Sequence, residues 1–381
     1  MVWQQLTANL QVVWAALTAF VVVVLLTPAV GGMARLLGVV DRSEGGRRAT
    51  PRGVPRLGGL ALFLGVLVPS LAFLPLTQTM RGILLGATVA TTVGAIDDFR
   101  GLAWWQKLAG QVLAAAIPAG FGIRVTSFNF PLIGPHDVQP AVGMTLTIVF
   151  IVAVMNMVNF LDGLDGLAAG VCAISALSFC LIDLSLTGQI GAAILAASVF
   201  GACIGFLRHN FYPARIFMGD SGAMLLGYSL AAISVQGLLK TAALATLVLP
   251  LLVLAVPLVD TSFVVAKRLK HGLPVYLADR THLHHRFENI GYSQRRAVVY
   301  LYGWCAILAL TALATHFVPL RPHPPHRSWD WTNVGIDAAV ALAAVASSLY
   351  VVYLLEIVKL ANPFIRRREE LARDATVRKS A

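Results

Sequence analysis

The chain has 381 residues, of which 57% are hydrophobic and only 12% are charged, and its mean hydropathy is +0.76. About a quarter of the residues of a soluble domain are charged, so this composition excludes a soluble globular protein and indicates an integral membrane protein. The net charge of +11 falls mainly in the loops between apolar runs, which argues against a nucleic-acid-binding protein.

Apolar segments recur along the whole chain, and about 20 residues are needed to cross the hydrocarbon core of a bilayer. Eleven candidate spans lie at residues 10–31, 57–76, 80–96, 106–120, 142–159, 164–182, 188–207, 221–237, 242–266, 297–318 and 333–358. They predict an all-α, polytopic membrane protein with about eleven transmembrane helices. We expect a single transmembrane catalytic domain over residues 1–362, followed by a charged cytoplasmic tail at residues 363–381.

The basic residues predict the orientation of these spans. With eleven spans, 24 of the 29 Lys and Arg residues lie in loops on the same side as the C-terminus. Cytoplasmic loops carry the excess of basic residues in membrane proteins. We therefore expect the N-terminus outside and the C-terminus in the cytoplasm, so that the polar clusters described next all meet at the cytoplasmic face.

The first polar cluster closes the third span, where Asp97 and Asp98 are adjacent. Neighbouring side chains of a helix point about 100° apart, so one carboxylate can face a metal ion while the other faces a neighbouring group. Lys107 follows about two helical turns further along the chain. A solvated helix end is the alternative interpretation of this cluster.

The second cluster, residues 156–167, joins the fifth and sixth spans. It contains two amides and two acids, which are Asn156, Asn159, Asp162 and Asp165. Acids at membrane depth are costly and tend to be functional, and carboxylate and amide oxygens suit Mg²⁺. On a helix, Asp162 and Asp165 would share a face because they are three residues apart. A polar turn, with Gly163 and Gly166 making the bend, is the alternative.

Two further clusters and one basic stretch lie on the same side. Asp220 precedes the eighth span, where it can cap the helix or hold a Mg²⁺ ion that bridges phosphates. The loop after the ninth span gathers three histidines and two arginines, which are Arg280, His282, His284, His285 and Arg286. Because arginines repel a cation, we expect this loop to bind an anion such as phosphate rather than zinc. Arg48 lies in a basic stretch before the second span, which binds an anionic group or serves as an orientation signal.

Acids for a divalent metal, bases for phosphates and a lipid environment together indicate phosphoryl transfer at a membrane surface. No Walker A, HExxH or protein-kinase signature occurs in the sequence, so ATP hydrolysis and zinc proteolysis lose support.

Five motifs, taken together and in this order, resemble a known family. They are Pro55-Arg-Leu-Gly-Gly59, Asp97-Asp-Phe-Arg-Gly-Leu102, residues 156–167, Phe217-Met-Gly-Asp-Ser-Gly222, and residues 274–286. The chain resembles the polyprenyl-phosphate N-acetylhexosamine-1-phosphate transferases of glycosyltransferase family 4. It is most similar to the bacterial transferases that start O-antigen, enterobacterial common antigen and teichoic acid synthesis. One departure is Thr50, because relatives often have a histidine at this position after the basic pair.

The resemblance implies that a UDP-sugar, with UDP-GlcNAc expected, and undecaprenyl phosphate give undecaprenyl-diphospho-GlcNAc and UMP. It implies Mg²⁺, with Mn²⁺ as a substitute, held by Asp220 and Asn159. Catalytic roles fall to Asp97 and Asp98 beside the lipid phosphate, and to Asp162 and Asp165 at the nucleotide end. Substrate binding falls to a wider set, Lys107, Asn156, Arg48, Arg280, His282, His284, His285 and Arg286. Direct in-line attack is favoured, and a covalent intermediate on Asp98 is the alternative.

The expected location is the cytoplasmic membrane of a bacterium, with several membrane passes, the active site facing the cytoplasm and no nucleic acid as a partner. The resemblance is compatible with a homodimer. Three alternatives stay open at this point: the same chemistry on another substrate such as UDP-MurNAc-pentapeptide, a transporter of lipid-linked sugars, and a non-catalytic scaffold.

Overall fold

The structure is a computed structural model, and it describes residues 2–41, 53–130, 134–237, 293–317 and 342–350, together with Leu254 and Ala339. The described chain is mostly helical. Its named helices are α1 (Val2–Ala8), α2 (Leu10–Leu36), α3 (Gly58–Phe73), α4 (Gln78–Arg100), α5 (Trp104–Gly120), α6 (Pro140–Leu161), α7 (Leu167–Ser185), α8 (Ile190–Asn210), α9 (Gly219–Gln236) and α13 (Gln294–Phe317).

Nine of the eleven predicted spans coincide with one of these helices. The predicted span at 242–266, and most of the one at 333–358, lie outside the described residues. Six of the described helices are long and apolar enough to cross a membrane, namely α2, α4, α6, α7, α8 and α13. The chain is therefore a multi-pass membrane protein.

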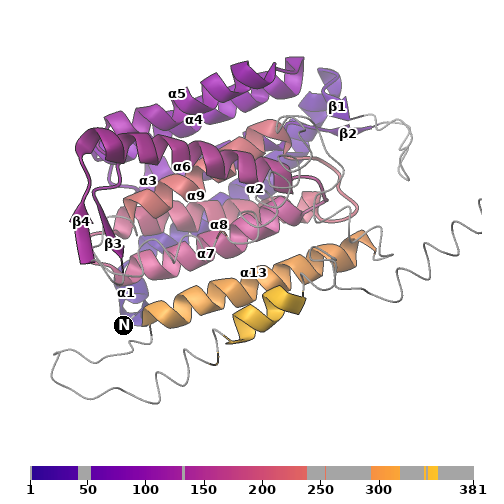
Figure 1. Ribbon diagram of the computed structural model, residues 1–381. Coiled ribbons are helices and arrows are strands. Elements are labelled where there is room, and N and C mark those ends of the chain that lie inside the picture. Colours follow the sequence, from indigo (N-terminus) through magenta and orange to yellow (C-terminus); the bar gives the residue numbers. More distant parts are fainter. Residues whose placement is uncertain are drawn as a thin grey trace, which may run out of the picture.

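Two short antiparallel hairpins add strands to the expected all-helical fold. Strand β1 (Val40–Asp41) pairs with β2 (Val54–Pro55), and β3 (Ser127–Phe130) pairs with β4 (Gly134–Asp137). The hairpins lie at opposite ends of the helical bundle, and the N-terminus lies at the end that carries β3 and β4 (Figure 1). Alternating passes through a membrane place loops in this way, at the two ends of the bundle.

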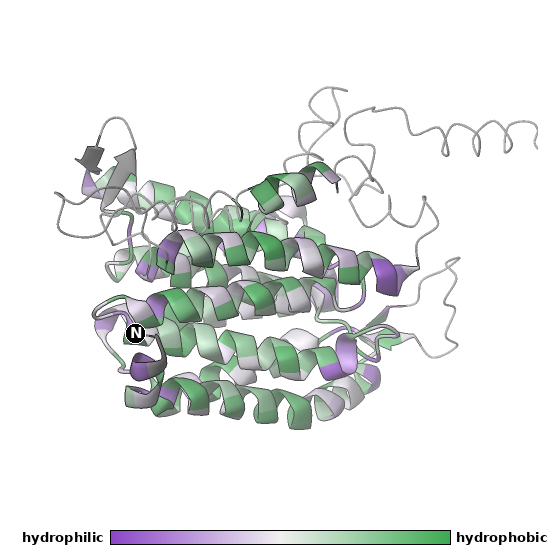
Figure 2. Ribbon diagram, turned by 90° about the horizontal axis from the view of Figure 1, so that it is seen from below, coloured by the Kyte–Doolittle hydropathy of each residue, from purple (hydrophilic) through white to green (hydrophobic). Residues whose placement is uncertain are grey.

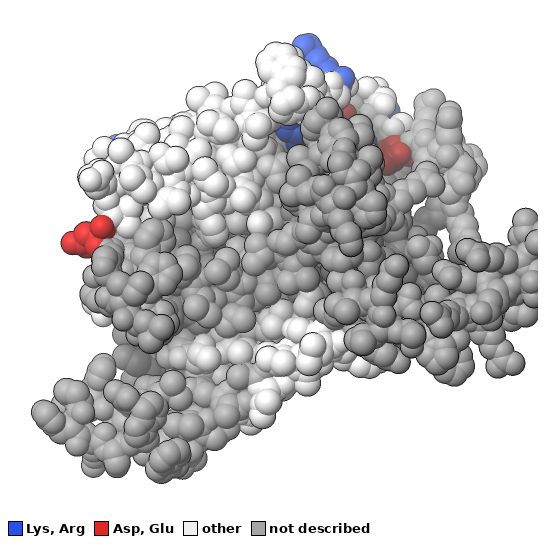
Figure 3. Space-filling view, in the orientation of Figure 1, with Lys and Arg blue, Asp and Glu red and all other residues white. Residues whose placement is uncertain are grey.

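The surface of the bundle matches a lipid environment. Hydrophobic residues run along the helices, and hydrophilic residues gather toward the helix ends (Figure 2). The described side of the molecule in Figure 3 is almost free of charged side chains between its ends. Helix α2 exposes large apolar side chains such as Leu25, which is 69% exposed. Many such side chains on one helix favour contact with hydrocarbon or another apolar surface.

Helix α9 forms the centre of the bundle and packs against α3, α4, α6, α7 and α8. All of its residues except Asp220 and Gln236 are buried. Small residues permit this close packing, as is common for membrane helices. A Cβ atom on Gly94 of α4 would lie 2.5 Å from the Cα of Ser221, and one on Gly227 would lie 2.6 Å from the Cα of Met155 in α6. Helix α9 therefore packs closely against α4 at its first turn and against α6 further along.

Candidate active site

Four helix ends carry the predicted acids and amides to one place. Asp97 and Asp98 lie in the last turn of α4, and Asn159 lies in the last turn of α6. Lys107 lies in the first turn of α5, and Asp220 is the second residue of α9. These five side chains, here called the helix-end cluster, lie at an end of the bundle rather than in its middle.

The carboxylate of Asp98 binds the N-terminus of α9. One oxygen accepts a hydrogen bond from the backbone N–H of Asp220 at 2.8 Å. The other accepts from the N–H of Ser221 at 3.0 Å and from its hydroxyl at 2.8 Å. Unpaired N–H groups at a helix start attract an anion, and here the anion comes from another helix. Asp98 caps α9, so the interpretation of Asp220 as the cap is wrong.

Gly219 is required at the start of α9 for two reasons. Its φ of +69° lies in the left-handed region that favours glycine. A Cβ atom there would also lie 2.5 Å from both carboxylate oxygens of Asp98. The glycine of the Gly219-Asp220 pair therefore gives the carboxylate of Asp98 access to the helix start.

Lys107 joins two carboxylates from different helices. Its ammonium group lies 2.9 Å from an oxygen of Asp97 and 2.7 Å from Oδ1 of Asp220. The second oxygen of Asp97 accepts the N–H of Leu102 at 2.6 Å, which fixes the short loop between α4 and α5. The spacing of residues 97–107 thus serves to bring the lysine back onto the acids. Such partly buried, charge-assisted contacts are stronger than contacts at an open surface.

The two asparagines of α6 face different partners. The amide of Asn159 donates to Oδ1 of Asp220, the same oxygen that Lys107 contacts. Asn156, one turn earlier, exchanges hydrogen bonds with the side chain of Gln111 of α5, at 2.8 and 3.3 Å. Asn159 therefore belongs to the helix-end cluster, whereas Asn156 ties α6 to α5 beside it.

The segment that contains β2 lies directly against the loop before α9. The N–H of Phe217 donates to the carbonyl of Pro55 at 2.9 Å, and the N–H of Gly59 donates to the carbonyl of Met218 at 2.8 Å. A Cβ atom on Gly59 would lie 2.1 Å from the backbone nitrogen of Gly222. The Pro55–Gly59 and Phe217–Gly222 motifs are therefore two halves of one structural unit.

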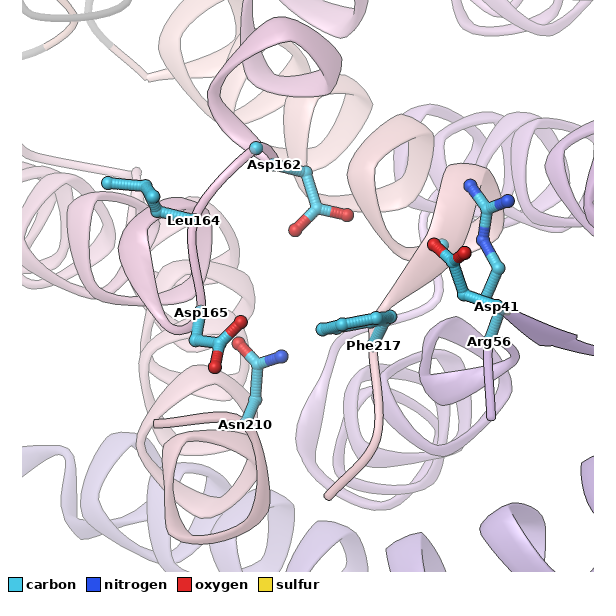
Figure 4. A pocket seen from close by; sticks show the side chains of 9 residues that line it. Asp41, Arg56, Asp162, Leu164, Asp165, Asn210 and Phe217 are labelled. Carbon is cyan, nitrogen blue, oxygen red and sulfur yellow. The ribbon is translucent and has the colours of Figure 1, made fainter. Parts of the chain in front are cut away.

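A pocket of about 150 Å³ opens beside this unit. Its lining residues come from the turn after α6, the end of α8, the loop before α9 with its first residue, and the segments of β1 and β2. They are Asp41, Arg56, Asp162, Gly163, Leu164, Asp165, Asn210, Phe217 and Gly219. Asp165 and Asn210 lie side by side, Asp162 points into the space between them and Phe217, and Arg56 lies beyond the phenyl ring (Figure 4). Because Gly219 also borders the helix-end cluster, the two sites adjoin.

The turn of residues 162–166 carries two of the predicted acids. It lies between the end of α6 at Leu161 and the start of α7 at Leu167. Asp162 and Asp165 therefore do not share a helix face, because the chain bends here and is not helical. Gly166 has a φ of +81° in this bend. Both acids still line the pocket. The predicted turn is therefore confirmed, and the functional role of its two acids stays a prediction.

Burial and neighbouring charge act on Asp162. Loss of water around this carboxyl group raises its pKa well above the usual range, and the carboxylates of Asp220 and Asp98 raise it further, against an opposing effect of Arg56. The buried carboxyl of Asp165 is held differently, because one of its oxygens accepts the N–H of Ala214 at 2.8 Å. The two acids of the turn therefore lie in different surroundings within one pocket.

The cluster offers hard oxygen donors to a divalent ion, but few of them. Asp220 and Asn159 are adjacent, the carboxylates of Asp97 and Asp220 share the ammonium group of Lys107, and the carboxylate of Asp98 binds the start of α9. Among the described residues, no group of three or more His, Cys, Asp or Glu side chains can hold a metal. Mg²⁺ is usually held by one or two carboxylates together with substrate phosphates, so the donor set fits this ion.

Several predicted site residues lie outside the described residues. They are Arg48, Arg280, His282, His284, His285 and Arg286. Conversely, the site contains residues that sequence reasoning did not assign to it, namely Arg56, Asp41, Asn210 and Ser221. Arg56 lies in the Pro55–Gly59 motif and Ser221 in the Phe217–Gly222 motif, so both could have been predicted from their motifs. Asn210 ends α8 and Asp41 precedes a basic stretch, and neither carried a signal of its own.

Comparison with known proteins identifies the family of this chain. Residues 80–238 match the sequence profile of the family described as glycosyl transferase family 4. The chain is 34% identical over 305 residues to a probable undecaprenyl-phosphate N-acetylglucosaminyl 1-phosphate transferase of Bacillus subtilis, which covers 80% of this chain and 85% of that protein. It is 35% identical over 331 residues to a decaprenyl-phosphate N-acetylglucosaminephosphotransferase of Mycobacterium leprae, covering 79% and 83%.

A second group of relatives differs in substrate. The chain is 30% identical over 328 residues to a phospho-N-acetylmuramoyl-pentapeptide-transferase of Clostridioides difficile, which covers 79% of this chain and 98% of that protein. Both groups match most of the chain, and the matched profile contains the helix-end cluster and the turn of residues 162–166. The chain therefore belongs to glycosyl transferase family 4, among the polyprenyl-phosphate N-acetylhexosamine-1-phosphate transferases.

Proposed function

We propose that this protein transfers N-acetylglucosamine-1-phosphate from UDP-GlcNAc to undecaprenyl phosphate. The products are undecaprenyl-diphospho-GlcNAc and UMP, and the reaction initiates a cell-envelope polysaccharide. The observation that carries the proposal is the juxtaposition of the helix-end cluster with the pocket, in a chain that is 34–35% identical to proteins named as undecaprenyl- or decaprenyl-phosphate N-acetylglucosamine phosphotransferases.

The main obstacle to this reaction is the approach of two anions. Repulsion between two unit charges 4 Å apart is about 4 kcal/mol at an effective dielectric constant of 20. Lys107 supplies positive charge in the cluster, and Arg56 supplies it in the adjoining pocket. Mg²⁺, held by Asp220 and Asn159, would neutralise charge on the diphosphate. Phosphoryl transfer depends on such charge compensation and on alignment rather than on a strong base.

The contacts of Asp98 favour direct attack of the lipid phosphate over a covalent intermediate on this residue. Both of its oxygens accept hydrogen bonds, three in all, from Asp220 and Ser221. A carboxylate that is held this way is a poor nucleophile, because attack would cost these bonds. We assign Asp98 to holding the start of α9, and Asp97 to holding Lys107 for the lipid phosphate.

The pocket is the proposed site for the nucleotide end of the UDP-sugar. The ring of Phe217 offers a flat face on which a base can stack. Asp162, Asp165 and Asn210 surround that space with hydrogen-bonding groups, and Arg56 offers a positive charge for a phosphate. The adjoining cluster then receives the diphosphate, so the sugar-bearing phosphorus lies toward Asp220.

We further propose eleven spans in a single catalytic domain, with the N-terminus outside and the cluster at the cytoplasmic face of the membrane. The distribution of Lys and Arg residues supports this orientation. The position of the cluster at helix ends also opposes a transporter, whose substrate site would lie near the middle of the membrane. A homodimer is compatible with this arrangement.

The second candidate substrate is UDP-MurNAc-pentapeptide. It is favoured by relatives named for that activity, which are 30–34% identical to this chain. The transferases named for N-acetylglucosamine are the stronger matches to this chain, so UDP-MurNAc-pentapeptide is the alternative. The chemistry at the cluster and in the pocket would be the same for both.

The decisive experiment is UMP release by the purified protein in detergent. Undecaprenyl phosphate and Mg²⁺ are supplied with UDP-GlcNAc, UDP-GalNAc or UDP-MurNAc-pentapeptide, one at a time. We expect UMP release from UDP-GlcNAc that depends on both the lipid and the metal. Release from another sugar nucleotide alone would keep the chemistry and change the substrate. Folded protein that releases no UMP from any of them would overturn the proposal.

A further inference from the structure

Helix α13 contacts the turn of residues 162–166 beside the pocket, although it lies outside the part of the chain that matches the family profile. The profile ends at residue 238, whereas α13 comprises Gln294–Phe317 and packs along α7 (Figure 1). The hydroxyl of Tyr302 donates a hydrogen bond to the carbonyl of Gly166 at 2.5 Å. Gly170 makes room for this contact, because a Cβ atom there would lie 2.1 Å from the tyrosine ring.

Both the N–H and the carbonyl of Gly166 form hydrogen bonds. Its N–H donates to the side-chain oxygen of Asn210 at 3.0 Å, and its carbonyl accepts from Tyr302 and from the N–H of Gly170, at 2.9 Å. The residue has a φ of +81°, so these contacts fix a backbone bend rather than a helix. Asp165 precedes it directly and lines the pocket. The direction of the Asp165 side chain therefore depends on how Gly166 is held.

A second residue of α13 holds the opposite loop of the pocket. The guanidinium group of Arg295 donates to the carbonyl of Tyr212 at 3.2 Å and lies 5.2 Å from the centre of the tyrosine ring. The same loop carries Ala214, whose N–H donates to the carboxylate of Asp165. Two residues of α13, about two turns apart, thus contact both loops that converge on Asp165.

We infer that α13 shapes the nucleotide pocket, and that Tyr302 is a positioning residue for the nucleotide end of the sugar nucleotide. This inference rests on the proposed function for the identity of the ligand. Tyr302 acts through Gly166 and is not a lining residue of the pocket. Its loss is therefore expected to weaken nucleotide binding while leaving the chemistry of the helix-end cluster intact.

The test compares Tyr302→Phe with Tyr228→Phe. Each variant keeps the ring and loses one hydroxyl that donates to a backbone carbonyl, since Tyr228 donates to Ile83 at 3.0 Å away from the pocket. For Tyr302→Phe we expect the KM for UDP-GlcNAc and the Kd for UMP to rise about threefold to tenfold, as for one lost hydrogen bond. The KM for undecaprenyl phosphate and kcat are expected to stay within about twofold. Tyr228→Phe is expected to lower the melting temperature and leave both nucleotide constants unchanged.

A measurement without substrate separates this inference from the proposed function. Hydrogen–deuterium exchange of the 162–167 backbone is expected to be faster in Tyr302→Phe than in the wild type, and unchanged in Tyr228→Phe. Wild-type protein that releases no UMP would overturn the proposed function but not the effect on exchange. The role of Tyr302 would be overturned if an active Tyr302→Phe protein matched the wild type in its KM for UDP-GlcNAc, its Kd for UMP and its hydrogen–deuterium exchange. Equal losses in kcat and in the KM for both substrates would mark it as purely structural.

Discussion

The helix-end cluster and the pocket adjoin at Gly219, yet they are built in different ways. In the cluster, side chains on rigid helices bind one another directly, as Lys107 does with Asp97 and Asp220. In the pocket, the lining acids lie on a turn, and backbone contacts such as that of Ala214 with Asp165 hold them. One site is fixed by helix packing, and the other by the loops around it.

This difference suggests that the cluster serves the chemical step and the pocket serves ligand binding. Groups that must be aligned closely for chemistry gain from rigid elements, whereas groups that recognise a ligand can lie on loops that a scaffold positions. We therefore expect changes in the cluster to lower kcat and changes in the pocket to raise KM for the nucleotide. The following substitutions test that separation, from the largest expected effect to the smallest.

Asp220→Asn is expected to abolish turnover almost completely, with a loss of at least about a thousandfold. The substitution removes the charge that Lys107 and Asn159 contact and that the proposed Mg²⁺ requires. UMP binding, measured by calorimetry, should stay close to that of the wild type because Asp220 does not line the pocket. Asp137→Asn, an exposed acid of β4, serves as the control. Near-normal turnover in folded Asp220→Asn protein would remove this residue from the metal site.

Gly219→Ala is expected to lower kcat by about a hundredfold and also to destabilise the protein. The added Cβ would lie 2.5 Å from the carboxylate of Asp98, and the alanine would have to adopt a φ of +69°. Left-handed backbone alone costs an alanine about 1–2 kcal/mol. Gly188→Ala isolates that cost, since Gly188 has a φ of +78° and nothing lies within 4 Å of an added Cβ. If both variants lost stability alike and kept kcat, the contact with Asp98 would not matter for turnover.

Asp165→Ala is expected to raise the KM for UDP-GlcNAc roughly tenfold to a hundredfold while kcat changes little. The substitution leaves the N–H of Ala214 without its acceptor and widens the pocket. Asp165→Asn keeps an acceptor oxygen and should have a smaller effect. Initial rates over a range of UDP-GlcNAc concentrations give both constants. A fall in kcat with unchanged KM would assign Asp165 to the cluster rather than to the pocket.

The sequence predicted the cluster better than the pocket, for a physical reason. Acids and amides at the ends of apolar runs are costly unless they have a function, so Asp97, Asp98, Asn159 and Asp220 stood out from their surroundings. The helices themselves were predictable because apolar length alone defines a membrane span. The family resemblance then assigned roles to motifs that composition could not interpret.

The contacts between motifs were not predictable from the sequence. The capping of α9 by Asp98 joins residues more than a hundred positions apart, and the contact of Tyr302 with Gly166 spans a similar separation. Both depend on which helices pack together, and apolar runs with weak periodicity carry little information on that point. The bend at residues 162–166 was also ambiguous, since its glycines suit a turn and its acids suit a site.

Asp162→Asn is expected to have the smallest effect, a shift in stability that depends on pH. Burial, together with the charges of Asp220 and Asp98, raises the pKa of Asp162 in the folded protein above its value of about 3.9 in the unfolded chain. A raised pKa means that the contribution to stability is complete below the unfolded value and is lost as pH rises through the folded one. At pH 7.5 without metal, the asparagine variant should therefore melt a few degrees higher than the wild type. This difference should shrink as the pH falls toward about 4, where the wild-type carboxyl is protonated in both states. Melting curves between pH 4 and 8 test the sign, and a difference that does not change with pH would show that ionisation of Asp162 is not its cause.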